Sequence, residues 1–126
     1  MKNFPIAKKE IIHFIGIGGI GMSGLAQIMK NMGFNVQGSD QSKNKNFLQC
    51  KKLGIKLALG HKKQNIKNAT IIVRSSAIKK NNPEIIAAKE KKLPIYDRAV
   101  MLSNVVSFKK NIVVTGSHGK TTTTSL

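Results

Sequence analysis

The sequence predicts an α/β fold, a Rossmann-like parallel sheet with flanking helices, and three observations support this prediction. Short apolar runs alternate with longer amphipathic stretches along most of the 126 residues. A glycine-rich stretch, "GIGGIGMSG", separates the first apolar run from the first amphipathic stretch. The hydrophobic content of 40% is enough for a core of normal size, so one compact domain is the starting expectation.

The first half of the chain alternates strand and helix. We expect strands at residues 11–17, 35–38 and 55–58, with helices at 20–32 and 46–53 between them. In the first helix, Leu25, Ile28 and Met32 recur at helical spacing, and Gly33 is a stop signal. The second strand ends at Ser39-Asp40, so a polar pair follows it directly.

The second half repeats this order. "TIIV" at residues 70–73 reads as a buried strand that emerges into a polar loop at residues 74–76. Asn82-Pro83-Glu84 opens a helix, residues 93–96 form a further strand, and a helix runs from Arg98 to about Val106. The run Asn111 to Thr115 predicts one more strand, which we assign to a second α/β domain. The expected boundary lies near residue 109, with residues 1–109 as the first domain and 110–126 as the truncated start of the second.

The charge and the cysteine content exclude several classes. A formal charge of +17 invites a nucleic-acid interface, but there are only two arginines, the lysines are spread along the chain, and few aromatic residues are available to stack on bases. Solvated surface lysines are therefore favoured. The single cysteine, Cys50, rules out a disulfide framework and a multi-cysteine metal site. The sequence has no unbroken apolar segment that could serve as a signal peptide or a membrane span. We therefore expect the protein in the cytoplasm, without a membrane partner.

The first glycine loop predicts a diphosphate site. Gly16, Gly18 and Gly21 satisfy G-x-G-x-x-G between a strand and a helix. The glycines allow a tight turn, a close approach of backbone N–H groups to the diphosphate, and close packing at the positive end of the helix dipole. The alternative is a tight turn that binds no ligand.

Asp40 stands where dinucleotide-binding folds place an acidic residue, about 20 positions after the loop. By itself this pattern indicates NAD. The same carboxylate could hydrogen-bond the ribose of another nucleotide diphosphate, or could cap a turn. The residues of this half therefore indicate a diphosphate without specifying which one.

The second glycine loop predicts a nucleoside triphosphate site. Gly116-Ser117-His118-Gly119-Lys120-Thr121 is similar to a P-loop, in which backbone amides and a lysine hold phosphates and a hydroxyl reaches Mg²⁺. Position 114, where the longer motif has its first glycine, is Val114, so the loop is the shorter T-G-x-x-G-K-T kind. We expect His118 to contact nucleotide or solvent and not to act as a base.

The two loops together resemble one family. "HFIGIGGIGMSGLA", "GSD" at 38–40, "GH" at 60–61, "SSAI" at 75–78, "NPE" at 82–84, "RAVML" at 98–102 and "TGSHGKTTTTSL" at the end follow the order found in Mur ligases, over nearly all of the chain. The most similar branch is the one that acts on UDP-N-acetylmuramate and L-alanine. Ser117 stands where that family usually has Thr.

This resemblance implies an ATP-dependent ligase of peptidoglycan synthesis, in which the muramate carboxylate becomes an acyl phosphate that the amine of L-alanine attacks. The first domain would bind the UDP part of the substrate. The implied contacts are Gly18, Gly19, Ile20, Gly21, Met22 and Ser23 at the diphosphate, with Asp40, His61, Ser75, Ser76 and Arg98 as candidates for ribose, uracil or phosphate.

The resemblance also assigns the second loop to ATP. Gly116, Ser117, His118, Gly119, Lys120, Thr121 and Thr122 would bind the nucleotide, with Lys120 steadying the transferred phosphate and Thr121 binding Mg²⁺. Because the groups that complete such a site are missing from the 126 residues, we expect the chain alone to bind the UDP-substrate without ligase activity. The open alternatives are the related ligase that recycles murein peptides and an NAD-binding oxidoreductase domain.

Overall fold

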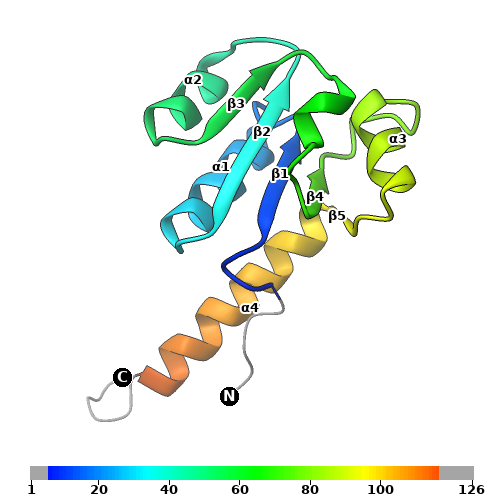
Figure 1. Cartoon of the computed structure of the whole chain (residues 1–126). Helices are drawn as coiled ribbons and strands as arrows, with labels where there is room; N and C mark the ends of the chain where they lie inside the picture. Colours follow the sequence, from blue (N-terminus) through cyan, green and yellow to red (C-terminus); the bar gives the residue numbers. More distant parts are fainter. Residues whose placement is uncertain (1–5, 117–126) are drawn as a thin grey trace.

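The computed structural model describes residues 6–116 and contains one five-stranded, all-parallel sheet (Figure 1). The strands are β1 (Ile11–Ile15), β2 (Asn35–Asp40), β3 (Lys56–Leu59), β4 (Ile71–Arg74) and β5 (Ile95–Asp97). Their order across the sheet is β3-β2-β1-β4-β5. The predicted Rossmann-like sheet is thus confirmed, and each of the first five expected strands is present with its ends shifted by a few residues.

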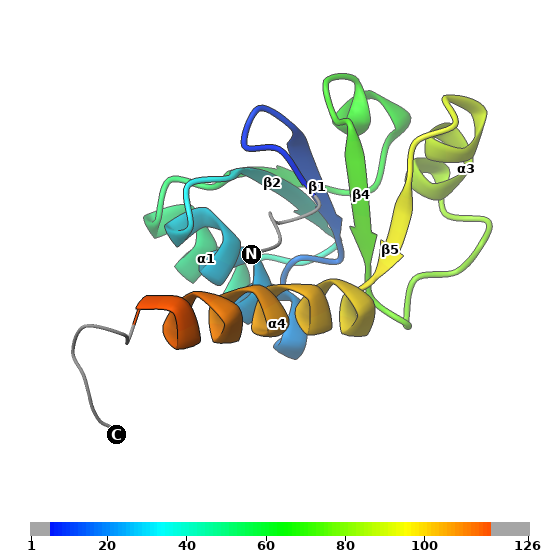
Figure 2. The same ribbon diagram turned by 90° about the horizontal axis from the view of Figure 1, so that it is seen from below.

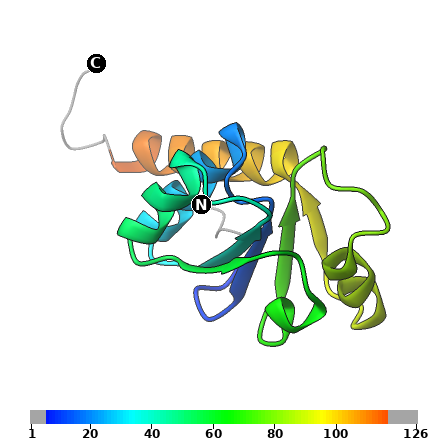
Figure 3. The same ribbon diagram turned by 90° about the horizontal axis from the view of Figure 1, so that it is seen from above.

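Helices cover both faces of the sheet. Helices α1 (Ile20–Asn31), α2 (Lys45–Lys52) and α4 (Arg98–Gly116) lie on one face, and α3 (Pro83–Glu90) with the short 3₁₀ helix η1 (Lys63–Ile66) lies on the other (Figures 2 and 3). Asn82 caps α3, because its side-chain oxygen accepts from the N–H of Glu84 at 2.9 Å, as the Asn-Pro-Glu pattern predicts. Among residues 6–116, none of the helices is both long and apolar enough to cross a bilayer.

The central strand β1 is buried on both faces, and its alternating side chains enter two different cores. Ile12 and Phe14 join the larger apolar cluster under α1, α2 and α4. Ile15 belongs to the smaller cluster under α3 and η1. His13 points the same way as Ile15 and is only 1% exposed, so a polar ring is buried on that face.

The topology creates a crevice beside the first glycine loop. From β1 the chain runs to β2 on one side, whereas β4 pairs with β1 on the other side. At such a reversal the loops after the neighbouring strands separate, which leaves room for a ligand at the carboxyl ends of the strands. The loop that follows β1 lies at this point.

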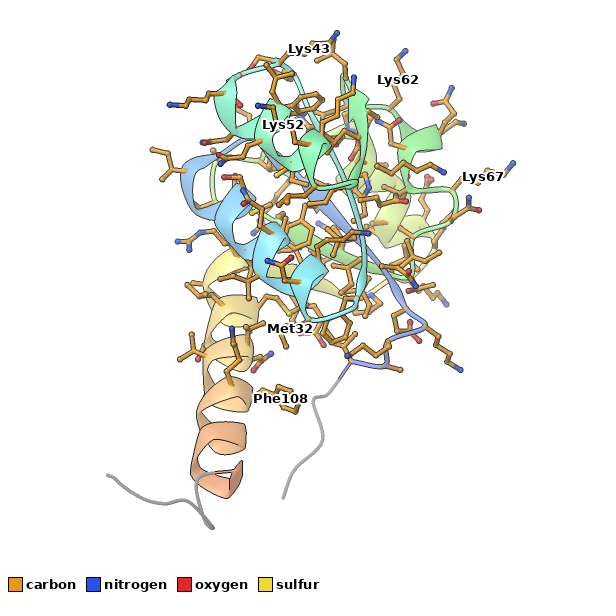
Figure 4. All side chains as sticks on the ribbon, turned by 90° about the vertical axis from the view of Figure 1, so that its left-hand side faces the viewer. Met32, Lys43, Lys52, Lys62, Lys67 and Phe108 are labelled. Atoms are coloured by element: carbon orange, nitrogen blue, oxygen red, sulfur yellow. The ribbon has the colours of Figure 1, made fainter. Side chains whose placement is uncertain are left out.

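The lysines are on the surface, as the composition indicates. Lys43, Lys52, Lys62 and Lys67 are exposed and extend away from the body of the molecule (Figure 4). Lysines that remain hydrated in this way contribute to solubility and do not require a bound partner.

The prediction of a strand from Asn111 to Thr115 is wrong, because α4 continues through this segment to Gly116. The far part of α4 extends beyond the sheet, away from any strand (Figure 1). A segment without a neighbouring strand satisfies its backbone groups through helical hydrogen bonds instead. The domain boundary near residue 109 falls within α4 and stays a prediction.

Candidate functional site

The first glycine loop is a tight turn between β1 and α1. Gly16 has a φ of +84°, a left-handed conformation that glycine adopts without steric cost. The N–H groups of Gly16 and Ile17 both donate to the carbonyl oxygen of Ser39, at 2.8 and 3.0 Å. The loop is therefore fastened to the end of β2.

The N-terminus of α1 is open to a ligand. Its N-cap residue, Gly19, has no side chain to accept from the first turn, and the first helical bond runs from the N–H of Ser23 to the Gly19 carbonyl. Among the described residues, the N–H groups of Ile20, Gly21 and Met22 have no partner. Unpaired N–H groups at the positive end of a helix dipole attract an anion.

Arg98 lies against this first turn. A Cβ atom added to Gly21 would approach the Arg98 side chain to 2.8 Å at Nε and 2.9 Å at Cζ. The glycine thus leaves the space in which the guanidinium rests. The tertiary structure brings a fixed positive charge from the start of α4 to the open end of α1, 77 positions earlier in the chain.

Asp40 closes on the loop. Its Oδ2 accepts from the N–H of Gly18 at 2.7 Å, and its Oδ1 accepts from the N–H of Gln41 at 2.7 Å. The Gly18 carbonyl accepts from Asn44 and Asn46, at 3.1 and 3.2 Å. The turn-capping role that the sequence left open for Asp40 is therefore present in the structure, where it orders the loop.

A cavity of about 840 Å³ lies beside the loop at the carboxyl edge of the sheet. It is lined by residues at or after the ends of β1, β2, β3 and β4: Gly16, Asp40, Gln41, Gly60, His61, Ala77, Ile78, Lys79, Asn81, Asn82 and Pro83. The lining mixes amide, imidazole and ammonium groups with a few apolar side chains. Such a mixture suits a polar ligand with some apolar surface.

His61 lines the cavity, and its ring contacts Ser39 and Glu84 on the side away from the cavity. Its Nδ1 lies 3.1 Å from Ser39 Oγ and 3.4 Å from Glu84 Oε2, and its side chain is only 6% exposed. Its Nε2 has no hydrogen bond to any residue that the structure describes. One ring nitrogen is thus engaged within the protein and the other is left for a ligand.

The buried carboxylate of Glu84 accepts hydrogen bonds from four residues. Its Oε1 accepts from His13 Nε2 at 2.6 Å and from Ser39 Oγ at 2.7 Å. Its Oε2 accepts from Asn65 Nδ2 at 2.7 Å and from the N–H of Lys62 at 3.1 Å. Every lone-pair direction of this fully buried group therefore has a donor.

These donors keep Glu84 ionised. Burial by itself opposes the charge and raises the pKa, but the hydrogen bond and electrostatic attraction of His13, together with the bonds from Asn65 and Ser39, outweigh it and lower the pKa to about 2. Facing Glu84, which can only accept, His13 Nε2 is a donor, and the Nδ1 of the same ring lies 2.8 Å from the amide nitrogen of Gln37.

The structure brings together some of the predicted site residues and separates others. Gly18, Asp40 and His61 meet at the crevice, and Ser75 lies next to Gly16, its Oγ 3.6 Å from a Cβ placed there. Ser76 is exposed in the same loop, and Ile20 is 92% exposed at the start of α1. Met22 and Ser23, by contrast, have buried side chains, so only their backbone groups face the helix end.

Sequence reasoning missed Glu84, His13 and the cavity residues Ile78 and Asn82. The last two and Glu84 stand in the motifs "SSAI" and "NPE", which were noticed for their serines and for the start of a helix. The contact between His13 and Glu84 joins positions 71 residues apart. The available signal was His13, a single polar residue within the apolar run at residues 11–15.

The second glycine loop lies largely outside the described residues. Gly116 is the last residue of α4, and the segment from Ser117 to Thr122, including Lys120 and Thr121, is not described. Within residues 6–116, no three His, Cys, Asp or Glu side chains gather in a way that could hold a metal ion. The ATP and Mg²⁺ assignments therefore stay predictions.

Comparison with known proteins identifies the family. The model of the Mur ligase family, catalytic domain, matches residues 11–110. A UDP-N-acetylmuramate–L-alanine ligase from Pelagibacter ubique (strain HTCC1062) is 70% identical over 121 residues, which are 96% of this chain and 26% of that protein. The chain thus spans about a quarter of the length of this curated relative.

Solved structures show the same fold. The crystal structure of a UDP-N-acetylmuramate-alanine ligase from Thermotoga maritima matches with a TM-score of 0.76 and 32% identity, covering 79% of this chain and 23% of that one. A UDP-N-acetylmuramate:L-alanyl-gamma-D-glutamyl-meso-diaminopimelate ligase from Neisseria meningitides matches with a TM-score of 0.66 and 32% identity, covering 71% and 28%. The sheet, the two glycine loops in the sequence and these matches lead to one conclusion: the chain belongs to the Mur ligase family.

Proposed function

We propose that this chain is the part of a cytoplasmic, ATP-dependent ligase that binds UDP-N-acetylmuramate, the substrate to which L-alanine is joined. The observation that carries the proposal is the open N-terminus of α1, which presents free N–H groups beside Arg98 at the end of the glycine loop. A diphosphate placed there would meet backbone donors, a helix dipole and a guanidinium together.

The neighbouring cavity supports a ligand larger than a diphosphate. A volume of about 840 Å³ accommodates a nucleoside, and Asp40, His61 and Asn82 offer hydrogen-bonding groups of different kinds within it. In the structure, Asp40 Oδ2 accepts from the N–H of Gly18. We propose that the carboxylate exchanges this contact for a ribose hydroxyl when the ligand binds.

Identity to the relatives supports the L-alanine branch over the recycling branch. The Pelagibacter ubique relative, named for L-alanine addition, matches nearly the whole chain at 70% identity. At 32% identity, the Neisseria meningitides ligase, named for a longer peptide, and the Thermotoga maritima alanine ligase are equally similar to this chain, so the support comes from the Pelagibacter ubique relative. The NAD-binding alternative explains the first loop and leaves the second loop without a role.

The ATP-dependent step is proposed from the family and from the second loop. Lys120 and Thr121 have the chemistry to hold a transferred phosphate and Mg²⁺, which would supply charge neutralisation when bound. The residues that the structure describes act before the ATP-dependent step. They bind the UDP part of the substrate and orient it at the carboxyl edge of the sheet.

Isothermal titration calorimetry tests the binding proposal. We expect the chain to bind UDP-N-acetylmuramate, and the variant Gly18→Val to bind it at least about tenfold more weakly, because unpaired or displaced polar groups cost roughly 1–3 kcal/mol. A Cβ atom at Gly18 would lie 2.9 Å from Asp40 Oδ2 and 2.8 Å from Asn44 Oδ1, so the side chain enters the space at the loop.

Gly24→Ala is the matched control, because a Cβ atom there meets nothing within 4 Å and the residue lies on the exposed side of the same helix. We expect this variant to bind UDP-N-acetylmuramate as the unaltered chain does. Binding of NADH together with no binding of UDP-sugars would refute the proposal in favour of an oxidoreductase domain.

A further inference from the structure

The buried carboxylate of Glu84 connects the elements that surround the cavity. It sits in the first turn of α3, directly after the cavity residues Asn82 and Pro83. Its contacts reach β1 through His13, β2 through Ser39, and the segment after β3 through Lys62 and the η1 residue Asn65. The apolar packing of α3 would not require a charge at this position, and burying one is costly unless it is fully paired.

The hydrogen-bond geometry determines which atom of His61 faces the ligand. Ser39 Oγ donates its only proton to Glu84 at 2.7 Å, so the contact of 3.1 Å between this oxygen and His61 requires the ring to donate from Nδ1. Glu84 Oε2, an acceptor only, lies 3.4 Å from the same nitrogen. In the neutral ring, a proton on Nδ1 leaves Nε2 as a hydrogen-bond acceptor.

We infer that Glu84 is a positioning residue for the ligand cavity, which holds His61 with its proton on Nδ1 and presents Nε2 to a donor group of the ligand. A hydroxyl of a ribose or the imide N–H of a pyrimidine has the required chemistry. This inference rests on the proposed function for the identity of the ligand. The arrangement of His61 and its loop can be measured without any ligand.

The same carboxylate anchors the loop that carries His61. Asn65 donates to the Gly60 carbonyl at 2.8 Å as well as to Glu84, so both ends of the segment 60–65 are tied to one point. Ser39 extends the network to the glycine loop, because its carbonyl accepts from Gly16 and Ile17. Removal of the charge therefore affects two walls of the cavity.

The first test compares Glu84→Gln with Glu90→Gln in the ligand-free chain. Glu90 is exposed at the end of the same helix, so the control removes a charge from α3 without touching the network. Nitrogen-15 NMR of the histidine rings reports the tautomer, and amide hydrogen exchange reports the loop. We expect the His61 signal to leave the Nδ1–H position and the Lys62 amide to exchange at least about tenfold faster only in Glu84→Gln.

The second test is a double-mutant cycle for binding of UDP-N-acetylmuramate. If Glu84 acts through His61, Glu84→Gln weakens binding about tenfold in the unaltered background and much less in the His61→Ala background, because a shared interaction is lost only once. A general loss of structure would lower stability in both backgrounds without this coupling. Should Glu84→Gln fail to fold, Asn65→Ala removes the loop side of the network and takes its place in the amide-exchange and binding measurements. The His61 tautomer, whose Nδ1 contacts Ser39 and Glu84 and not Asn65, should then stay unchanged.

Two results would overturn the inference: an unchanged His61 tautomer and Lys62 exchange in a folded Glu84→Gln chain, or the same loss of affinity in both backgrounds. Absence of binding by the unaltered chain would count against the proposed function instead. The ligand-free measurements then decide the role of Glu84 by themselves.

Discussion

The two faces of the sheet are built on different principles. Under α1, α2 and α4 the core is apolar, and large side chains such as Phe14, Met29 and Phe34 are almost completely buried. Under α3 and η1 the apolar cluster is smaller, and beside it His13, Ser39 and Glu84 are buried as a hydrogen-bonded group. Both faces share β1, so one strand supplies side chains to both arrangements.

The difference teaches where directional contacts are needed. Apolar packing is favourable in proportion to the area removed from water and has little directional preference. Hydrogen bonds to a carboxylate hold their partners at defined distances and angles. The polar network lies next to the cavity, where positions of individual atoms matter, and the apolar core lies on the face that supports the fold.

The largest expected effect breaks the apolar face. Phe14→Ala removes a ring with no exposed surface from the centre of that core, and we expect the free energy of unfolding to fall by about 4 kcal/mol. Urea denaturation followed by circular dichroism measures it. Leu48→Ala, at a side chain that is 45% exposed on α2, is the control and should cost much less. A loss below about 1 kcal/mol for Phe14→Ala would show that the two faces do not differ as described.

Acid breaks the polar face. The pKa of Glu84 in the folded chain is about 2, below the value of 4.5 expected when the group is free. The stabilisation by the ionised carboxylate is therefore present above about pH 4.5 and is lost as the pH falls towards 2. The shift corresponds to roughly 3 kcal/mol of stability by linkage.

Urea denaturation at a series of pH values tests this, with Glu84→Gln as the comparison. We expect the variant to lose the part of the pH dependence that belongs to this carboxyl group. If both chains lose stability equally between pH 4.5 and 2, the charge of Glu84 does not stabilise the fold.

Overpacking sharpens the description of the apolar face. A Cβ atom on Gly38 would lie 2.5 Å from Ile17 Cδ1 and 2.9 Å from the Phe14 carbonyl oxygen. We therefore expect Gly38→Ala to lower the free energy of unfolding by about 2 kcal/mol, because β2 must move away from the glycine loop and from β1. Thermal unfolding compares it with Gly24→Ala, where an added Cβ atom meets nothing within 4 Å. Equal melting temperatures for Gly38→Ala and the unaltered chain would contradict the close approach.

The smallest effect concerns an ion pair outside both cores. Arg74 Nε lies 3.1 Å from Asp97 Oδ1, and the two side chains are 28% and 58% exposed. Water and salt screen such a pair, so Asp97→Asn should change the free energy of unfolding by about 0.5 kcal/mol or less. If Asp97→Asn lowered the free energy of unfolding as much as Gly38→Ala does, the ion pair between β4 and β5 would contribute more to stability than its exposure indicates.

The sequence by itself determined the order of the elements and the first glycine loop. Alternation of apolar runs and amphipathic stretches is a local property, and so are the glycine spacing before α1 and the Asn-Pro-Glu start of α3. The pairing of Asp40 with the loop was also accessible, because fold geometry places the end of β2 beside the end of β1. The segment from Asn111 to Thr115 was misread because its apolar run fits a helix as well as a strand.

Only the tertiary structure decided which distant side chains meet. His13 and Glu84 come together across 71 positions, and Arg98 reaches Gly21 from a helix that begins after the last strand. Neither contact leaves a periodic pattern in the sequence, because each depends on the twist of the sheet and on how α3 and α4 pack against it. Burial gives these contacts their chemical effect. An ionised carboxylate, a defined tautomer and an open helix end exist only where the surrounding structure excludes water and supplies the partners.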